Sequence, residues 1–255
     1  MWDLGLDVSE GNGTLDWETI ADHDPPVLFA YIRVSEGIDH TDGMFAYNWQ
    51  QSLIASDTRK AARGIPLLRQ PYLAYHPELD PVKQAALFDA YVLSDHGDLP
   101  PVIDMELAKG IKPSAIIAGL DKVAKTLIYY GYQQPWVYTR TSFVQEYIII
   151  GGLPWASMNQ YHYYLAQWLT SGVEDTRPLT IPNGMDPSIV LVHQTTDKGQ
   201  PIGQTNGTMD YDRWLGSLDS LYAYANMPNP FKGGLTLEQR VTNLEVIARA
   251  HGWEV

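Results

Sequence analysis

The chain has 255 residues, enough for one large domain with a substantial core, and its 45% hydrophobic and 18% charged residues argue against a disordered or fibrous protein. A formal net charge of -13, with no Lys/Arg-rich run, argues against nucleic acid as a partner. There is no cysteine, which excludes disulfides, thiolate metal sites and cysteine nucleophiles.

The first residues, Met1 to Asp3, lack the basic region and the long apolar run of a signal peptide. We therefore expect export, if it occurs, to use another route or a removed segment. No apolar stretch reaches the roughly 18 residues that a membrane-spanning helix needs, so we expect no membrane span.

Apolar runs of strand length recur along the chain, with helix-like segments between them. The expected strands are Leu4 to Val8, Val27 to Val34, Ile65 to Tyr75, Pro101 to Glu106, Trp136 to Tyr138, Tyr163 to Trp168 and Ile189 to Gln194. This alternation predicts an α/β fold with a mainly parallel sheet or barrel. In such barrels catalytic groups lie at the carboxyl ends of the strands, where the loops vary while the barrel holds their bases fixed.

Two helices can be placed between these strands. Asp80 is expected to cap the first, with Pro81 at its first position and an apolar stripe of Val82, Ala86, Ala90 and Leu93. The second is expected to start near Ser114, to end at Gly131, and to turn inward Ile117, Leu120, Ala124 and Leu127.

The C-terminal region differs in composition from the rest. We expect a barrel over residues 1–222, a Pro- and Gly-rich linker over 223–234 and a short helix over 235–255. The last segment carries Leu237, Val241, Leu244 and Ala248 at heptad spacing, which indicates one apolar seam. Two heptads are too few to establish a coiled coil, so the helix is expected either to dock on the barrel or to mediate self-association.

The strongest local feature is an apolar strand that ends in two acids, Asp104 and Glu106. Alternate residues of a strand share a face, so both side chains are expected to project together. Two close carboxylates do not ionise together easily, which leaves one as a proton donor near neutral pH, as glycoside hydrolysis requires. The alternative is that Asp104 caps a turn and Glu106 is solvated. Asp7, on the first strand, and Asp210, on the last, favour the first interpretation because a closed barrel brings those strands together.

Several motifs, in order, resemble glycoside hydrolase family 25, the Chalaropsis-type lysozymes. Gly5-Leu6-Asp7-Val8-Ser9 leads to Asn12-Gly13-Thr14-Leu15-Asp16-Trp17, and Arg33-Val34-Ser35-Glu36-Gly37 follows on the second strand. Val102-Ile103-Asp104-Met105-Glu106 resembles the family's Asp-x-Glu strand. The motifs that resemble its later strands are Pro135-Trp136-Val137-Tyr138-Thr139, Leu165-Ala166-Gln167-Trp168, His193-Gln194 and Met209-Asp210-Tyr211. The resemblance covers roughly residues 4 to 218.

This resemblance implies an irregular TIM-like β/α barrel of about eight strands with fewer helices. It also implies cleavage of the bond between N-acetylmuramic acid and N-acetylglucosamine in bacterial peptidoglycan. Glu106 would be the general acid, and Asp104 would assist the substrate N-acetyl group, with Asp7 and Asp210 as supporting carboxylates. The alternative within the family is attack by a water that Asp104 or Asp7 activates, and the sequence does not choose between these routes.

The resemblance also implies a saccharide groove. Its expected residues are Glu36, Tyr75, Tyr138, Trp168 and Gln194, although the family's Tyr-His strand aligns with either Tyr72 or Tyr75. The chain departs from the family at His193, where Trp often precedes Gln, and at Asp212, where Asn is common. These changes bear on substrate choice and activity.

We expect no cofactor and no metal, because the seven histidines show no metal-ligand spacing. The favoured setting is a phage or prophage lysin, released through a membrane pore or carried by the virion, since such an enzyme needs no signal peptide. Two alternatives are a non-catalytic sugar-binding or structural barrel of a virion or cell surface, and a glycosidase that acts on another N-acetylated polymer such as chitin.

Overall fold

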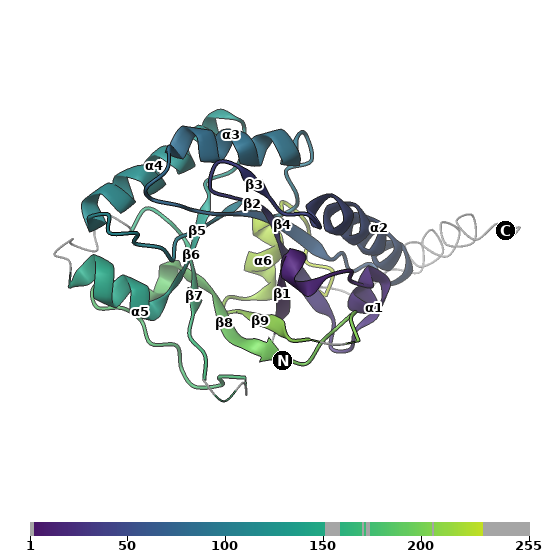
Figure 1. The fold of residues 1–255 in the computed structure, drawn as a ribbon. Helices are drawn as coiled ribbons and strands as arrows, with labels where there is room; N and C mark the ends of the chain where they lie inside the picture. The colour runs from purple at the N-terminus through teal and green to yellow at the C-terminus, as the bar shows by residue number, and fades with distance from the viewer. Residues whose placement is uncertain (1–2, 151–158, 170, 172–173, 206, 232–255) are drawn as a thin grey trace, which may run out of the picture.

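Strands form a barrel in the computed structural model, which describes residues 3–150, 159–169, 171, 174–205 and 207–231 (Figure 1). The barrel strands are β1 (Leu4–Val8), β2 (Val27–Glu36), β4 (Leu68–Ala74), β5 (Val102–Asp104), β6 (Trp136–Arg140), β7 (Tyr163–Ala166), β8 (Val190–Gly199) and β9 (Met209–Trp214). A two-residue strand, β3 (His40–Thr41), pairs with the end of β2. The predicted barrel of about eight strands is therefore confirmed.

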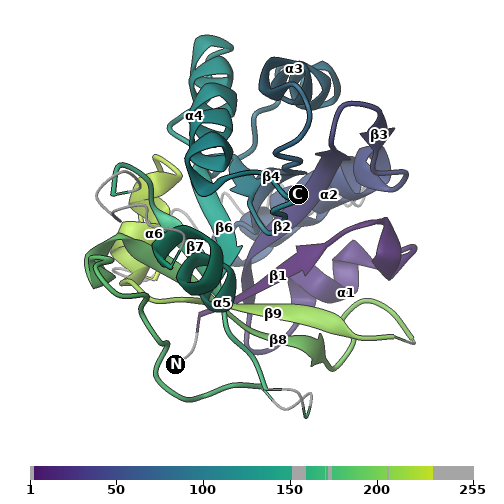
Figure 2. The same ribbon diagram turned by 60° about the vertical axis from the view of Figure 1, so that its left-hand side comes forward.

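Closure of the barrel depends on β1, which pairs in parallel with β2 and antiparallel with β9. Neighbouring strands are parallel from β1 through β2 and β4 to β8, and β9 runs antiparallel to both of its neighbours. Figure 2 shows β1, β9 and β8 side by side. Because β9 is reversed, the start of β9 lies at the same rim as the carboxyl ends of the parallel strands.

Most of the helices lie outside the ring of strands, whereas the last one, α6 (Leu218–Tyr224), is seen within the ring in Figure 1 and contributes Leu221 and Tyr222 to the inner apolar cluster. The others are α1 (Trp17–Asp22), α2 (Phe45–Arg63), α3 (Pro81–Val92), α4 (Pro113–Tyr129) and α5 (Thr141–Phe143). Short 3₁₀ or π turns add Glu10–Asn12, Val144–Ile149 and Pro187–Ile189. Within the described ranges, none of these helices combines the length and the apolar character that crossing a bilayer requires.

The prediction for α3 is correct in position and wrong in its buried face. Asp80 caps the helix by accepting from the backbone of Val82 and Lys83, as expected. The buried side chains, however, are Gln84, Ala85, Phe88 and Val92, whereas Leu93 is exposed. The Gln84 side chain accepts a hydrogen bond from His76 N at 2.9 Å and donates one to His76 O at 2.8 Å. Because these bonds hold Gln84 inward, the helix buries the face that contains Gln84 and not the predicted apolar stripe.

The predicted face of α4 is confirmed: Ile117, Leu120, Ala124 and Leu127 are all buried. Its apolar residues pack with those of the outward-facing strand positions into a layer between the barrel and its helices. A second apolar layer fills the barrel interior and contains Phe29, Tyr31, Tyr72, Tyr138 and Tyr164. The alternation of strand side chains explains both layers, because each strand supplies one face to each.

The last described helix extends past the predicted end of the barrel at residue 222. Tyr224 meets Trp136 edge to face, with ring centroids 5.1 Å apart, and its hydroxyl lies 3.0 Å from His162 Nε2. The packing of the barrel therefore includes the first residues of the expected linker. The expected helix over 235–255 lies outside the described residues, so its docking or self-association stays a prediction.

Candidate active site

The four predicted catalytic acids lie at one rim of the barrel. Asp7 is on β1, Asp104 ends β5, Glu106 follows two residues later, and Asp210 is near the start of β9. Asp7 and Asp210 are direct partners in the β1–β9 register and line one cleft of about 500 Å³ with Tyr72. The barrel thus joins residues that are separated by more than 200 positions in the chain.

The charges of these acids influence one another across the cleft. Burial raises the pKa of Asp7 well above its ordinary value, and the charges of Asp210, Asp212 and Asp104 raise it further. Burial also raises the pKa of Asp104, with contributions from Glu106 and Glu36. The site therefore keeps its carboxyl groups protonated to a higher pH than water would, since several anions so close together in a poorly solvated place repel one another.

Glu106 combines a raised pKa with access to solvent. Burial raises its pKa, and the positive charge of Arg140 opposes that effect. The Arg140 Nε lies 2.9 Å from Glu106 Oε1, and 26% of the Glu106 side chain remains exposed. A carboxyl whose pKa is raised by burial and that still reaches solvent has the properties of a general acid.

Asp210 is a carboxyl whose pKa lies close to neutral pH. Burial, together with the negative charges of Asp197 and Glu106, raises the pKa of Asp210 to about 7. The charge of Glu106 acts on Asp210 although the two acids come from the end of β5 and from β9. A change of one pH unit around 7 therefore changes the charge of the cleft.

Four buried tyrosines form the floor beneath the acids. Tyr31 stacks on Tyr72 with ring centroids 4.1 Å apart, and Tyr138 meets Tyr164 edge to face at 5.1 Å. The Tyr72 hydroxyl hydrogen-bonds to Asp7 and lowers its pKa, in opposition to burial. This floor excludes water below the carboxyl groups, which strengthens the electrostatic interactions among them.

Two predicted groove residues lie at the level of this floor: Tyr138 is one of its four tyrosines, and Gln194 is hydrogen-bonded to it. The Tyr138 hydroxyl donates to Gln194 Oε1 at 2.8 Å, and Gln194 Nε2 donates to Asp7 Oδ2 at 3.4 Å. Both side chains are buried, so they orient Asp7 from below. We interpret them as supports of the carboxyl cluster.

Glu36 and Trp168 lie farther out on the rim. Glu36 is 39% exposed and pairs with His76 Nε2 at 2.9 Å. Trp168, just after β7, lines a separate pocket of about 530 Å³ together with Arg140. Arg140 thus connects the Trp168 pocket with Glu106. A ligand that extends beyond the four acids could reach both Glu36 and Trp168.

The prediction that Tyr75 lines the groove is wrong. Tyr75 is 1% exposed, packs in the layer outside the barrel and donates its hydroxyl to Ile116 O at 3.3 Å. Tyr72 takes the groove position because it lies three residues earlier on β4, on the opposite face of the strand. An added Cβ at Gly119 of α4 would overlap the Tyr75 hydroxyl, which shows how closely that ring packs outside the barrel.

The sequence motifs do not single out Arg140, and they mark Asp212 only as a departure from the family. The signal for Arg140 was a cation at the carboxyl end of a predicted barrel strand, directly after Tyr138-Thr139. Asp212 is fully buried, and hydrogen bonds from Tyr164 and Gln194 lower its pKa in opposition to burial. Burial raises its pKa well above the ordinary value, with Tyr164 and Gln194 beside it.

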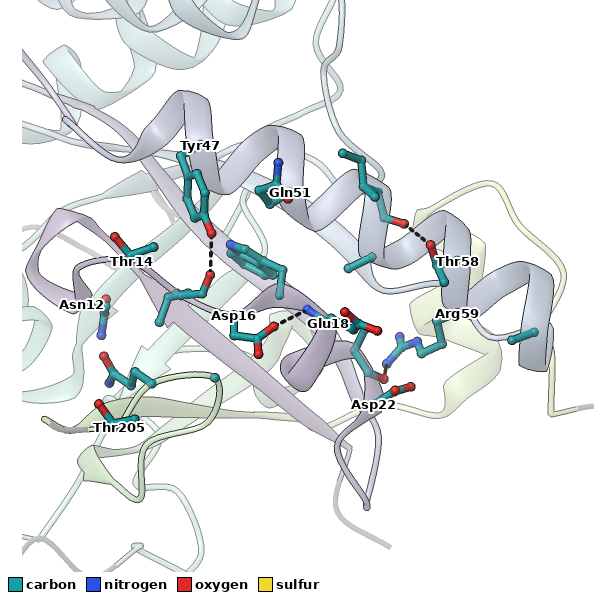
Figure 3. A pocket seen from close by; sticks show the side chains of 18 of the residues that line it. Asn12, Thr14, Asp16, Glu18, Asp22, Tyr47, Gln51, Thr58, Arg59 and Thr205 are labelled. Atoms are coloured by element: carbon teal, nitrogen blue, oxygen red, sulfur yellow. Dashed lines mark hydrogen bonds between the residues drawn. The ribbon is translucent and has the colours of Figure 1, made fainter. Parts of the chain in front are cut away.

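A larger hollow of about 1050 Å³ lies outside the barrel between α1 and α2 (Figure 3). Two of its three acids are already engaged: Asp16 caps α1 through the backbone of Glu18 and Thr19, and Asp22 pairs with Arg63 at 2.9 Å. None of the predicted site residues lines it. The largest of these hollows is therefore not the candidate active site, and the carboxyl cluster is the better candidate.

Comparison with known proteins agrees with this fold. The family model described as glycosyl hydrolases family 25 matches residues 6–203. The fold is similar to a bacterial lysozyme from Streptomyces coelicolor, with a TM-score of 0.70 and 21% identity over 89% of this chain and 98% of that one. It is also similar to a muramidase from Acremonium alcalophilum, with a TM-score of 0.66 and 19% identity over 88% and 99% of the two chains.

A curated relative is the uncharacterized protein YegX of Escherichia coli strain K12. The two sequences are 24% identical over 225 residues, which are 87% of this chain and 73% of YegX. The family match extends over most of the barrel and includes Asp7, Asp104 and Glu106. The chain belongs to glycosyl hydrolases family 25.

Proposed function

We propose that the protein is a muramidase that hydrolyses the β-1,4 bond between N-acetylmuramic acid and N-acetylglucosamine in bacterial peptidoglycan. The observation that carries the proposal is the raised pKa of Glu106 beside a second buried acid, Asp104, at the open rim of the barrel. The similarity to proteins described as a lysozyme and a muramidase supports the same activity.

In this proposal Glu106 donates its proton to the glycosidic oxygen as the bond to the anomeric carbon breaks. Asp104 Oδ1 is buried and has no hydrogen-bond partner among the described residues. This atom is suited to accept a hydrogen bond from the N–H of the substrate N-acetyl group, whose carbonyl oxygen would then attack the anomeric carbon. Water would open the resulting ring and return a proton to Glu106.

The competing route is direct attack by a water that Asp104 or Asp7 activates. It requires one of these acids to be ionised, whereas burial raises the pKa of both. The anomeric configuration of the first product separates the routes, because N-acetyl participation retains it and single displacement by water inverts it.

The decisive experiment is mass spectrometry of fragments released from purified peptidoglycan, with the new reducing ends labelled. The parent should expose N-acetylmuramic acid ends, and Glu106→Gln should release almost none. Glu18→Gln, a change on α1 away from the acids, is the matched control and should cleave like the parent. Absence of fragments from walls of several chemistries would favour a non-catalytic sugar-binding barrel, and cleavage of chitin alone would indicate a different N-acetylated polymer.

The proposed activity places the protein outside the cytoplasm, at the bacterial cell wall. A phage or prophage lysin stays our favoured setting. Production in a bacterial host with and without a co-produced membrane pore tests it: lysis that depends on the pore supports a pore-released lysin. Lysis without the pore would contradict that route.

A further inference from the structure

The pocket beside Trp168 differs in charge from the carboxyl cleft. It is lined by Arg140, Ser142, Gln145, Trp168, Thr180 and Asn183, among others. No carboxylate contributes to its lining in the described part of the chain, although the protein has 30 acidic residues and only 17 lysines and arginines. A cation with hydroxyl and amide groups around it in so acidic a protein indicates a place built for an anionic group.

The ion pair with Glu106 engages only one nitrogen of the Arg140 guanidinium, the Nε. This Nε lies 2.9 Å from Glu106 Oε1, and the Arg140 side chain is 45% exposed. The η-nitrogens have no partner among the described residues, and a guanidinium offers five N–H donors in a planar fork. The free edge of Arg140 can therefore bind a second carboxylate.

We propose that this pocket binds a carboxylate of the substrate, with Arg140 as the cation and Trp168 as an apolar wall. The proposal rests on the proposed function, because the glycan would have to extend along the rim from Glu106. In peptidoglycan the carboxylate has two sources, the lactyl group of muramic acid and the peptide attached to it. Both present the same planar anion that an arginine fork recognises.

This binding would couple substrate recognition to the acid. In the free protein the positive charge of Arg140 favours the ionised form of Glu106 and opposes the rise of its pKa. A substrate carboxylate that engages Arg140 neutralises this charge and draws the guanidinium toward the pocket. Glu106 then holds its proton more firmly at the moment when the glycosidic oxygen lies beside it.

Equilibrium titration of the full chain, followed by NMR or calorimetry, tests the pocket without any need for cleavage. The probes are N-acetylmuramic acid, its methyl ester and N-acetylglucosamine for the lactyl source, and muramyl dipeptide with free or amidated carboxyl groups for the peptide source. We expect the parent to bind one carboxylate form about tenfold more tightly than its neutral counterpart. The pair that shows this preference identifies the source.

Arg140→Gln should abolish the preference and leave the affinity for the neutral probes unchanged, whereas Arg140→Lys should restore part of it. Arg63→Gln, which removes a surface cation paired with Asp22, is the control and should retain the preference. Equal affinity of the parent for charged and neutral probes would overturn the proposal, as would an equal loss for both in Arg140→Gln.

The two proposals can fail separately. If the protein releases fragments with labelled N-acetylmuramic acid ends but shows no carboxylate preference, the proposed muramidase activity stands and the proposed carboxylate pocket is wrong. A carboxylate preference in a protein that releases no fragments would support the pocket as an anion-binding site and remove the proposed hydrolysis.

Discussion

Asp7 and Asp210 lie directly opposite each other in the antiparallel pairing of β1 with β9. Like charges at opposed positions of a sheet destabilise it, so the pair is favourable only when at least one carboxyl is neutral. This agrees with the pKa of Asp7, which is raised in part by the charge of Asp210, and with the rise of the pKa of Asp210 to about 7. Closure of the barrel therefore raises the pKa values of the two opposed carboxyl groups in the cleft.

The first prediction concerns the pH profile of hydrolysis. The negative charge of Glu106 contributes to the rise of the Asp210 pKa to about 7, and this repulsion is mutual, so an ionised Asp210 opposes the ionisation of Glu106. Asp210→Asn removes this charge, so the pKa of Glu106 should fall and activity should be lost at a lower pH. The measurement is kcat/KM against pH for the parent and the variant, and an unchanged alkaline limb would contradict the assignment.

The second prediction distinguishes the tyrosines of β4. Tyr72→Phe removes the hydroxyl that hydrogen-bonds to Asp7, and we expect kcat to fall about tenfold as the supporting carboxyl loses its orientation. Tyr75→Phe removes only a bond of 3.3 Å to Ile116 O outside the barrel. Its turnover should stay within about twofold of the parent. Equal losses in both variants would show that Tyr72 has no special relation to the cleft.

The third prediction concerns stability and Asp212. Folding raises the pKa of this buried carboxyl, so its contribution to stability is fully present below the unfolded pKa of about 4 and is lost as pH rises through the folded pKa. Asp212→Asn has no such dependence. The variant should match the parent near pH 4 and melt a few °C higher near pH 8.

Thermal unfolding followed by circular dichroism at both pH values measures this difference. A gap in Tm that does not change with pH would mean that Asp212 does not titrate with folding. A less stable variant at pH 8 would mean that the folded protein uses the ionised carboxylate.

The fourth prediction concerns the opposite side of the barrel from the acids. The buried Arg59 guanidinium donates to the carbonyl groups of Ile65, Pro66, Val27 and Ala21. Burial lowers its pKa to about 10, so it remains charged at neutral pH. Arg59→Met removes these four hydrogen bonds from a buried place and should lower the free energy of unfolding by more than about 3 kcal/mol.

Arg63→Met, one turn later on α2, is the control for this change. Arg63 and Asp22 are both about half exposed, and such surface pairs contribute about 1 kcal/mol or less. Urea unfolding of both variants gives the comparison. Similar losses would show that the buried network around Arg59 is no more important than an exposed ion pair.

Local patterns in the chain were sufficient for much of the fold. Asp80 and Pro81 predicted the start of α3, and the spacing of Ile117, Leu120, Ala124 and Leu127 predicted the buried face of α4. The order of the strand motifs predicted the family match, and the alternation within Val102 to Glu106 predicted that two acids share the rim. These features depend on residues close in sequence, which a linear pattern contains.

Other features depended on contacts between distant segments. The buried face of α3 is set by Gln84 binding the backbone of His76, and the outward position of Tyr75 by its packing on α4. The ion pair of Arg140 with Glu106 joins the ends of two neighbouring strands. The sequence by itself determined which residues could act as acids. Only the tertiary structure decided their protonation, because burial and the approach of other charges exist only after the barrel has closed.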